Sequence, residues 1–224
     1  MRNRDLRGWA FPLVGSLVLA WPLAAQRKAT EVDLARLAEG QGWKVVNRGV
    51  TAVEEEGKKG VRLDEKAGDG VAWLEGFQFS NGVLEIDLKG KNVLQRSFIG
   101  VAFRGVDEKT CDAVYFRPFN FQSTDPARRI HAVQYVSHPA FPWAKLRGER
   151  PGGFERAVEP APDPDGWFHA RIVVEKPKVS VFVNDAQAPS LVVEELSDRT
   201  GGWIGLFVGN GSGGAFANLR VIPK

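Results

Sequence analysis

The regular alternation of apolar and polar residues between Gly82 and His138 constrains the fold of this chain more than any other feature. The segments GVLEIDLKG, SFIGVAFRG, DAVYFRPFNF and IHAVQYVSH each alternate in this way, and turn-forming residues separate them. A period of two sends neighbouring side chains to opposite faces of a strand. We therefore interpret the stretch as four successive β-strands, each with one face suited to a core.

Two of these strands divide their side chains clearly between the faces. One face is apolar and suits a core, with Ile99, Val101, Phe103, Val114 and Phe116. The other face combines small residues with polar ones: Gly100, Ala102, Arg104, Tyr115 and Arg117. We expect this second face to form a groove against which a ligand lies.

The rest of the chain has the same β character. From Gly42 onward, short segments rich in Val, Trp and Phe lie between turns, and only the Pro- and Gly-rich stretch 138–167 lacks a sustained period. The apolar residues of the segment 30–39 lie near helical spacing, and the sequence has no internal repeat. Many short strands with almost no helix predict an all-β jelly-roll sandwich of two antiparallel sheets. We place it in one domain over residues 42–224, after a leader or short helix at 26–41.

The first 25 residues have the pattern of a secretory signal peptide. Three arginines precede an apolar run over residues 9–20, and the small residues before position 26 suit a cleavage site. The run is shorter than the roughly 20 residues that a membrane span needs. We expect cleavage near Ala25, export to the periplasm or the exterior, and no membrane attachment afterwards, with an uncleaved anchor as the alternative.

Charge and cysteine content limit the classes of partner that the chain can bind and the roles that its cysteine can have. Cleavage would remove three arginines and one aspartate, so the formal net charge falls from +3 to +1. A nearly neutral chain lacks the basic stripe of a nucleic-acid binder, so we expect no nucleic-acid partner. Cys111 is the only cysteine, which excludes an intramolecular disulfide, and it is more typical of a small buried side chain than of a nucleophile.

Several segments resemble a known family. The order of GVLEIDLKG, SFIGVAFRG, AVQYV, DGWFHARIVVEKPKVSVFVND and GWIGLFVGNGSGGAFANLRVIPK is similar to the concanavalin A-like lectin/glucanase superfamily. More closely, it resembles the 3-keto-disaccharide hydrolase domain over residues 42–223. Its W-x-x-x-x-I-x-V and G-x-I-G-L … F-x-N-x-x-I patterns are matched by Trp167, Ile172, Val174, Gly202, Ile204, Gly205, Leu206, Phe216, Asn218 and Val221. The resemblance implies a carbohydrate partner and cleavage of oxidised disaccharides or related glycosides.

The polar side chains of three consecutive strands are the candidates for the site. Arg104, Arg117 and Gln134 can bind sugar hydroxyls or carboxylates, and we expect them to bind substrate. Trp143, on the long loop, can stack on a sugar ring. Tyr115 and His138 can transfer protons and are the candidate catalytic pair. In the family a Glu often accompanies the glutamine on its strand, but here Ala132 occupies that position.

Other candidate groups have simpler explanations. His131 and His138 are seven residues apart, so on one strand they point to opposite faces and do not share a metal. Asp163 or Asp165 offers a possible divalent-cation site, but the sequence predicts no cofactor. Glu85 and Asp87 invite comparison with the laminarinase-type E-x-D-x-x-E signature, in which two carboxylates flank the glycosidic bond, but the second glutamate is absent. With Lys89 they fit the solvated face of a strand. A non-catalytic glycan-binding or adhesion module is therefore the alternative to a glycosidase.

Overall fold

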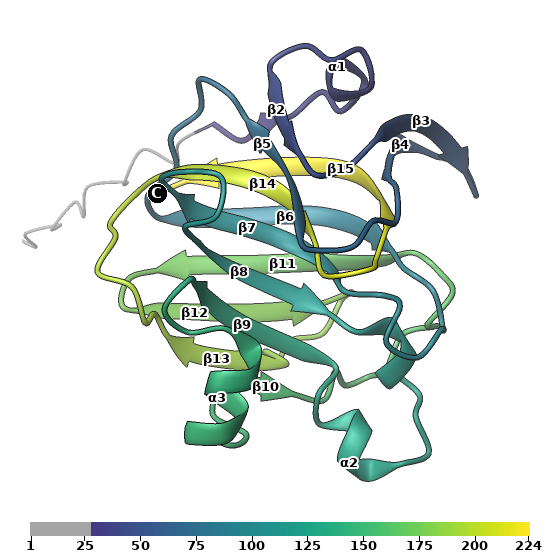
Figure 1. Ribbon diagram of the computed structural model, residues 1–224, viewed down its shortest axis with the longest axis vertical. Helices are drawn as coiled ribbons and strands as arrows, with labels where there is room; N and C mark the ends of the chain where they lie inside the picture. The colour runs from purple at the N-terminus through teal and green to yellow at the C-terminus, as the bar shows by residue number, and fades with distance from the viewer. Residues whose placement is uncertain (1–27) are drawn as a thin grey trace, which may run out of the picture.

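The computed structural model describes residues 28–224 as two stacked antiparallel sheets (Figure 1), which confirms the predicted jelly-roll sandwich. The predicted signal peptide lies outside the described residues. The eight-stranded sheet has the order β13 (Leu191–Glu194), β12 (Lys178–Val183), β11 (Phe168–Glu175), β6 (Gly82–Lys89), β15 (Gly214–Pro223), β4 (Lys58–Leu63) and β3 (Val50–Glu55), and β1 (Thr30–Glu31) pairs with β15. The seven-stranded sheet has the order β10 (Glu155–Arg156), β9 (Val133–His138), β8 (Cys111–Phe116), β7 (Ile99–Gly105), β14 (Trp203–Val208), β5 (Gly70–Leu74) and β2 (Trp43–Val46).

Helical structure is limited to short pieces in the connections. They are α1 (Ala35–Ala38), η1 (Pro118–Asn120), α2 (Pro126–Arg129) and α3 (Trp143–Glu149). The aperiodic stretch 138–167 contains both α3 and the two-residue strand β10. Figure 1 shows α2 and α3 at the end of the sandwich where β9 and β10 lie. Within residues 28–224, no helix has the length and apolar character needed to cross a membrane.

The core lies between the two sheets. The apolar side chains predicted to face it from β7 and β8, Ile99, Val101, Phe103, Val114 and Phe116, are all at most 1% exposed. They pack in one cluster with side chains of β6, β11 and β15 from the opposite sheet. The alternation along each strand therefore predicts the burial correctly here, because it matches the pleat of a strand with one face on a core.

A second apolar cluster covers the outer face of the seven-stranded sheet. It combines small side chains with rings: Val71, Trp73, Ala102, Cys111, Ala113, Tyr115, Val136, Leu146 and Phe207. Ala102 and Ala113 project little from the sheet, whereas Leu146 of α3 packs over it from the long loop. This is the face that the sequence predicts to meet a ligand.

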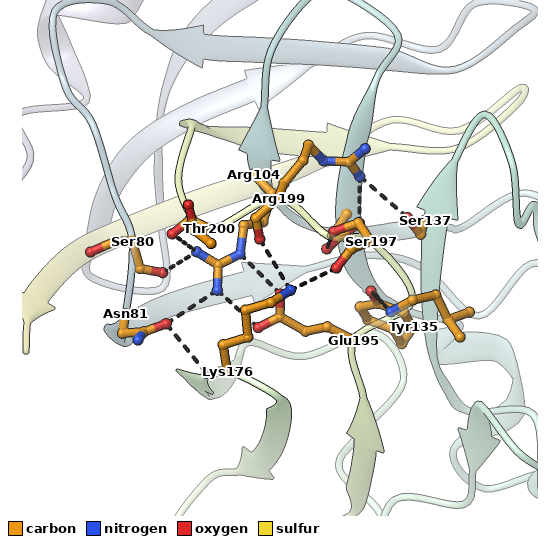
Figure 2. Close-up of polar contacts among 12 residues, drawn as sticks. Ser80, Asn81, Arg104, Tyr135, Ser137, Lys176, Glu195, Ser197, Arg199 and Thr200 are labelled. Carbon is orange, nitrogen blue, oxygen red and sulfur yellow. Dashed lines mark hydrogen bonds and ion pairs between the residues drawn. The ribbon is translucent and has the colours of Figure 1, made fainter.

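Arg104 does not belong to that face, which corrects the prediction from strand alternation. The residue has a positive φ of 55°, next to a register shift where β7 pairs with β14. Its guanidinium is fully buried and donates to Glu195 at 2.9 and 3.0 Å, as well as to the carbonyl oxygens of Ser80 and Thr200. Figure 2 shows this buried ion pair joining segments that are distant in sequence. Arg104 is therefore a structural residue.

Asp87 on β6 also differs from its predicted solvated position. The residue is only 6% exposed, and its carboxylate accepts hydrogen bonds from Lys58 and Asn218, both at 2.7 Å. The Nδ1 atom of His169 lies 2.8 Å from the same carboxylate. The outer face of the eight-stranded sheet therefore holds a compact polar network around Asp87.

Candidate functional site

A cleft of about 1000 Å³ opens over the outer face of the seven-stranded sheet. Tyr115, Val136, His138 and Phe207 contribute to it from the strands β8, β9 and β14. The connections around the sheet supply the remaining lining, including residues 94–96, 209–211 and the helix α3. The predicted groove therefore exists, and the long aperiodic stretch forms part of its wall.

A row of three polar side chains runs across neighbouring strands beside this cleft. In the register of the sheet, Tyr115 of β8 lies opposite Gln134 of β9, which in turn lies opposite Glu155 of β10. The Tyr115 hydroxyl donates to Oε1 of Gln134 at 2.9 Å and accepts from the guanidinium of Arg117 at 2.9 Å. Arg117 also donates to Oε1 of Gln134. These contacts fix the polar row before any ligand binds.

Burial sets the ionisation state of the row. Tyr115 is 4% exposed, and the loss of solvation raises the pKa of its hydroxyl to about 12. Burial also lowers the pKa of Arg117, although a guanidinium remains protonated in proteins and the group therefore stays charged. Near neutral pH, Tyr115 is therefore a hydrogen-bonding group held by a buried cation, and not a phenolate.

Glu155 is a site residue that the sequence did not reveal. Its carboxylate is 3% exposed and accepts two hydrogen bonds from Arg147, at 2.8 and 2.9 Å, and a longer one from Arg117 at 3.4 Å. Burial alone raises the pKa of Glu155, but the Arg147 hydrogen bonds and the two positive charges outweigh it, so the pKa is lowered. The residue lies in a Pro- and Gly-rich stretch on a two-residue strand, which gives no periodic signal.

His131, which precedes β9, and His138, the last residue of β9, both line the cleft, which corrects the prediction that they face opposite ways. His131 precedes the first residue of β9, so strand alternation does not extend to it. Its Nδ1 lies 2.8 Å from Oε1 of Glu155, in close contact but not aligned as an ideal hydrogen bond. Burial is the main cause that lowers the pKa of both His131 and His138. Both rings are therefore neutral near pH 7.

Aromatic and apolar side chains line much of the remaining wall. Phe98, Phe119 and Phe207 contribute rings, and Phe98 and Phe207 both pack against Tyr115. Trp143 on α3 and Leu94 are each 49% exposed and lie at the rim. The guanidinium of Arg147 lies 5.2 Å from the centre of the Trp143 ring. Such flat apolar surfaces suit the C–H face of a pyranose ring.

The structure brings most of the predicted residues to one place. Tyr115, Arg117, His138 and Trp143 line the cleft, and Gln134 lies buried beside them in the polar row. Arg104 lies elsewhere, as described above. Ala132, the position compared with a family glutamate, is 1% exposed within the core between the sheets.

The predicted cation position has a structural explanation. Asp163 accepts a hydrogen bond from the backbone of Asp165, which itself accepts one from the backbone of Asn92, so the two carboxylates stabilise a turn. Among the residues that the structure describes, no group of three or more His, Cys, Asp or Glu side chains is arranged to hold a metal ion.

The sequence matches one family model, described as a 3-keto-alpha-glucoside-1,2-lyase-like domain, over residues 35–222. The chain belongs to this family. The match includes the whole seven-stranded sheet over which the cleft opens. A comparison with curated proteins finds no match to the sequence.

Solved structures share the fold of this family member at low sequence identity. The carbohydrate-binding module CBM66 from Bacillus subtilis is 18% identical with a TM-score of 0.55, covering 80% of this chain and 95% of the module. A Bacillus subtilis protein of unknown function with a galectin-like fold is 11% identical with a TM-score of 0.52, over 81% and 90% of the two chains. The VIP36 exoplasmic/lumenal domain, solved with Ca²⁺ and mannose, is 13% identical with a TM-score of 0.52, over 81% and 82%.

Proposed function

We propose that this protein is an exported carbohydrate-active domain that binds a saccharide in the cleft and cleaves its glycosidic bond. The observation that carries the proposal is the combination, in one cleft, of aromatic walls, a fixed polar row and two neutral histidines. The family description, with its reference to a 3-keto-glucoside, supports the substrate class. The sandwich with a ligand-sized hollow over one sheet supports the place of binding.

Binding follows from the surfaces that the cleft offers. Trp143, Phe98 and Phe207 present flat apolar faces, and Tyr115 and Arg117 offer hydrogen-bonding groups that are already held in position. A pre-organised site loses less conformational entropy when it binds a ligand. The cleft volume of about 1000 Å³ is at the upper end of ligand pockets and suits a disaccharide or a longer saccharide.

The residues favour elimination over the hydrolysis that the resemblance implies. Hydrolysis in most glycosidases uses two carboxyl groups, one of them protonated as the acid. Glu155 cannot serve as this acid, because its pKa is lowered and its oxygens are occupied by Arg147. A neutral histidine, in contrast, is suited to remove a weakly acidic proton. A ketone at C3 of a sugar acidifies the proton on C2.

In the proposed step His138 removes the C2 proton of a 3-keto-glucoside. Those electrons form the C1=C2 double bond, the C1–O bond breaks, and the departing oxygen takes up a proton. His138 suits the role because its ring lines the cleft and stacks on Phe207, with ring centres 6.4 Å apart. The positive charge of Arg117 stabilises the negative charge that develops on the C3 oxygen. Tyr115 holds Arg117 in place.

The test is an assay of the purified protein on 3-keto and ordinary disaccharides, with and without added divalent metal. We expect the 3-keto substrate to give an unsaturated keto sugar that contains no oxygen from water. The His138→Gln variant should lose about 10²–10⁴-fold in rate. Because burial lowers the pKa of His138, the rate should rise with pH below about 6.5 and be level at neutral pH.

The matched control is His169→Gln, which changes a histidine on the opposite sheet and should leave the rate unchanged. Loss of activity in His131→Gln, with activity kept in His138→Gln, would assign the base to His131 and overturn the assignment made here. Absence of turnover on every substrate would remove the enzyme proposal.

A non-catalytic glycan-binding module is the second candidate. It is favoured by the hydrogen bonds that join Tyr115, Arg117 and Gln134 to each other, because they hold the three groups in place as a surface for a ligand to bind. In this case Trp143→Ala should abolish binding on a glycan array, whereas His138→Ala should leave binding intact and no saccharide should be converted.

A further inference from the structure

The cleft carries an excess of positive charge. Its lining includes five cationic side chains, Lys66, Arg96, Arg117, Arg128 and Arg147, but only two carboxylates, those of Glu65 and Asp69. One of the two carboxylates is already paired, because Glu65 accepts a hydrogen bond from Lys91 at 2.6 Å. A ligand in the cleft therefore meets far more positive than negative charge.

This excess is not a consequence of composition. The first 27 residues hold four arginines and one aspartate of the 30 basic and 27 acidic residues in the chain, which leaves 26 of each in the rest. The described part of the protein is thus formally neutral, yet this cleft is cationic. A cleft with apolar walls concentrates such a field and attracts ligands of the opposite charge.

Two of the cations lie close to the polar row. Arg117 and Arg147 share the single buried carboxylate of Glu155, so this group of three side chains keeps one net positive charge. Arg117 is almost fully buried, with 5% of its side chain exposed, and Arg147 is 36% exposed. Charge at this depth is screened by salt less than charge at the surface.

The other cations have weak partners or none within the described residues: Lys66 lies 3.5 Å from Asp64, with both side chains about half exposed. Arg96 is exposed and makes no side-chain hydrogen bond or ion pair with the described part of the chain, and its guanidinium lies near Gly211 of the cleft wall. Within residues 28–224 the guanidinium of Arg128 forms an ion pair with Asp125 alone, at 3.4 Å and with both side chains about half exposed. Exposed pairs of this kind contribute little to stability, so both guanidinium groups are available to a ligand.

We infer that the cleft selects acidic saccharides, which carry carboxylate or sulfate groups, over neutral ones. A guanidinium offers a planar pair of donors that matches the two oxygens of either group. The aromatic walls bind the sugar ring, and Arg96 and Arg128 at the rim bind its acidic substituents. The inference rests on the proposed carbohydrate binding and adds the charge of the ligand.

The experiment compares two probes with the same sugar backbone, one with free carboxylates and the other with these groups neutralised as methyl esters. Calorimetric titration of the full-length protein uses trigalacturonate and its neutral methyl ester at about 0.02 M and about 1 M salt. We expect trigalacturonate to bind about tenfold more tightly at low salt, and most of this difference to be lost at high salt, where the screening length is only about 3 Å. A sulfated galactose oligomer, run in parallel, identifies which acidic group binds better.

Single-charge variants locate the effect. Arg96→Gln and Arg128→Gln should each reduce the preference for trigalacturonate about threefold and leave binding of the methyl ester unchanged. Arg62→Gln removes the same charge from β4 on the opposite sheet and should change neither. Equal affinity for the charged and neutral probes overturns the inference while carbohydrate binding stands. If no saccharide binds, the proposed function and the inference both fail.

Discussion

The hydroxyl of Tyr115 and the ring of His138 lie in the same cleft, and burial shifts their pKa values in opposite directions. Loss of solvation raises the pKa of Tyr115 to about 12 and lowers the pKa of His138. In both cases burial disfavours the charged form, which is an anion for tyrosine and a cation for histidine. Of these two residues, only His138 therefore has a lone pair available as a base near neutral pH.

Asp87 provides a test of how a buried carboxylate contributes to stability. Burial alone raises the pKa of Asp87, but hydrogen bonds from His169, Lys58 and Asn218 outweigh it and lower the pKa to about 2. In the unfolded chain the pKa is near the ordinary value of 3.8. Between these values the unfolded state binds more protons, so we expect roughly 2 kcal/mol of stability to be lost as the pH falls through this window.

Urea unfolding at a series of pH values from neutral to about 2 measures this loss. The Asp87→Asn variant should have a lower free energy of unfolding than the parent protein at neutral pH. The curves of unfolding free energy against pH for the two proteins should converge in acid. Asp198→Asn changes an exposed aspartate and should follow the parent protein throughout. An Asp87→Asn curve parallel to that of the parent protein at every pH would contradict the assignment.

At the scale of the elements, the end of β7 shows how an ion pair can organise loops. Arg104 and Glu195 are both fully buried, and Arg104 also binds backbone carbonyls at Ser80 and Thr200 (Figure 2). One guanidinium therefore joins β7 to the segment before β6 and to the segment between β13 and β14. The positive φ of Arg104 lets the side chain reach this position.

Arg104→Met should cost about 3–5 kcal/mol in the free energy of unfolding, because among the described residues it leaves the buried Glu195 carboxylate with only Lys176 as a cationic neighbour, at 3.8 Å. The double variant Arg104→Met/Glu195→Met should lose less than the single variant, because it buries no unpaired charge. Chemical denaturation of both variants gives the coupling energy. Arg220→Met, which breaks an exposed pair with Glu85, should cost less than about 1 kcal/mol. A double variant no more stable than Arg104→Met would argue against this role.

At the scale of the whole molecule, two apolar layers serve different purposes. Phe216 is fully buried between the sheets, whereas Phe207 lies on the outer face, packs on Tyr115 and borders the cleft. Removal of a ring between the sheets leaves a dry cavity, but removal of a ring at the cleft leaves a space that water can enter. The same substitution should therefore have different consequences in the two layers.

Phe216→Ala should lower the free energy of unfolding by about 3–5 kcal/mol, and Phe207→Ala by no more than about 2 kcal/mol. Phe207→Ala should instead weaken saccharide binding, because it removes part of the aromatic wall. Thermal unfolding and titration with the saccharide, applied to both variants, separate the two effects. Equal losses of stability in the two variants would contradict the division into a core layer and a ligand-facing layer.

The sequence predicted the direction of a side chain correctly where the residue lies within a strand of regular alternation. The core faces of β7 and β8, and the outward direction of Tyr115 and Arg117, follow from alternation alone. It failed at Arg104, where a positive φ and a register shift interrupt the alternation, and at His131, which lies outside the strand. It missed Glu155, because a two-residue strand is too short to show a period.

The sequence alone determined the fold class, the face that meets the core and the face that meets the cleft, because these depend on local alternation of apolar and polar side chains. Only the tertiary structure decided which charged groups meet. The pairing of Glu155 with Arg117 and Arg147, and that of Arg104 with Glu195, joins residues far apart in the chain or on elements without a periodic pattern. Contacts of this kind depend on the stacking and register of whole strands, which no local pattern encodes.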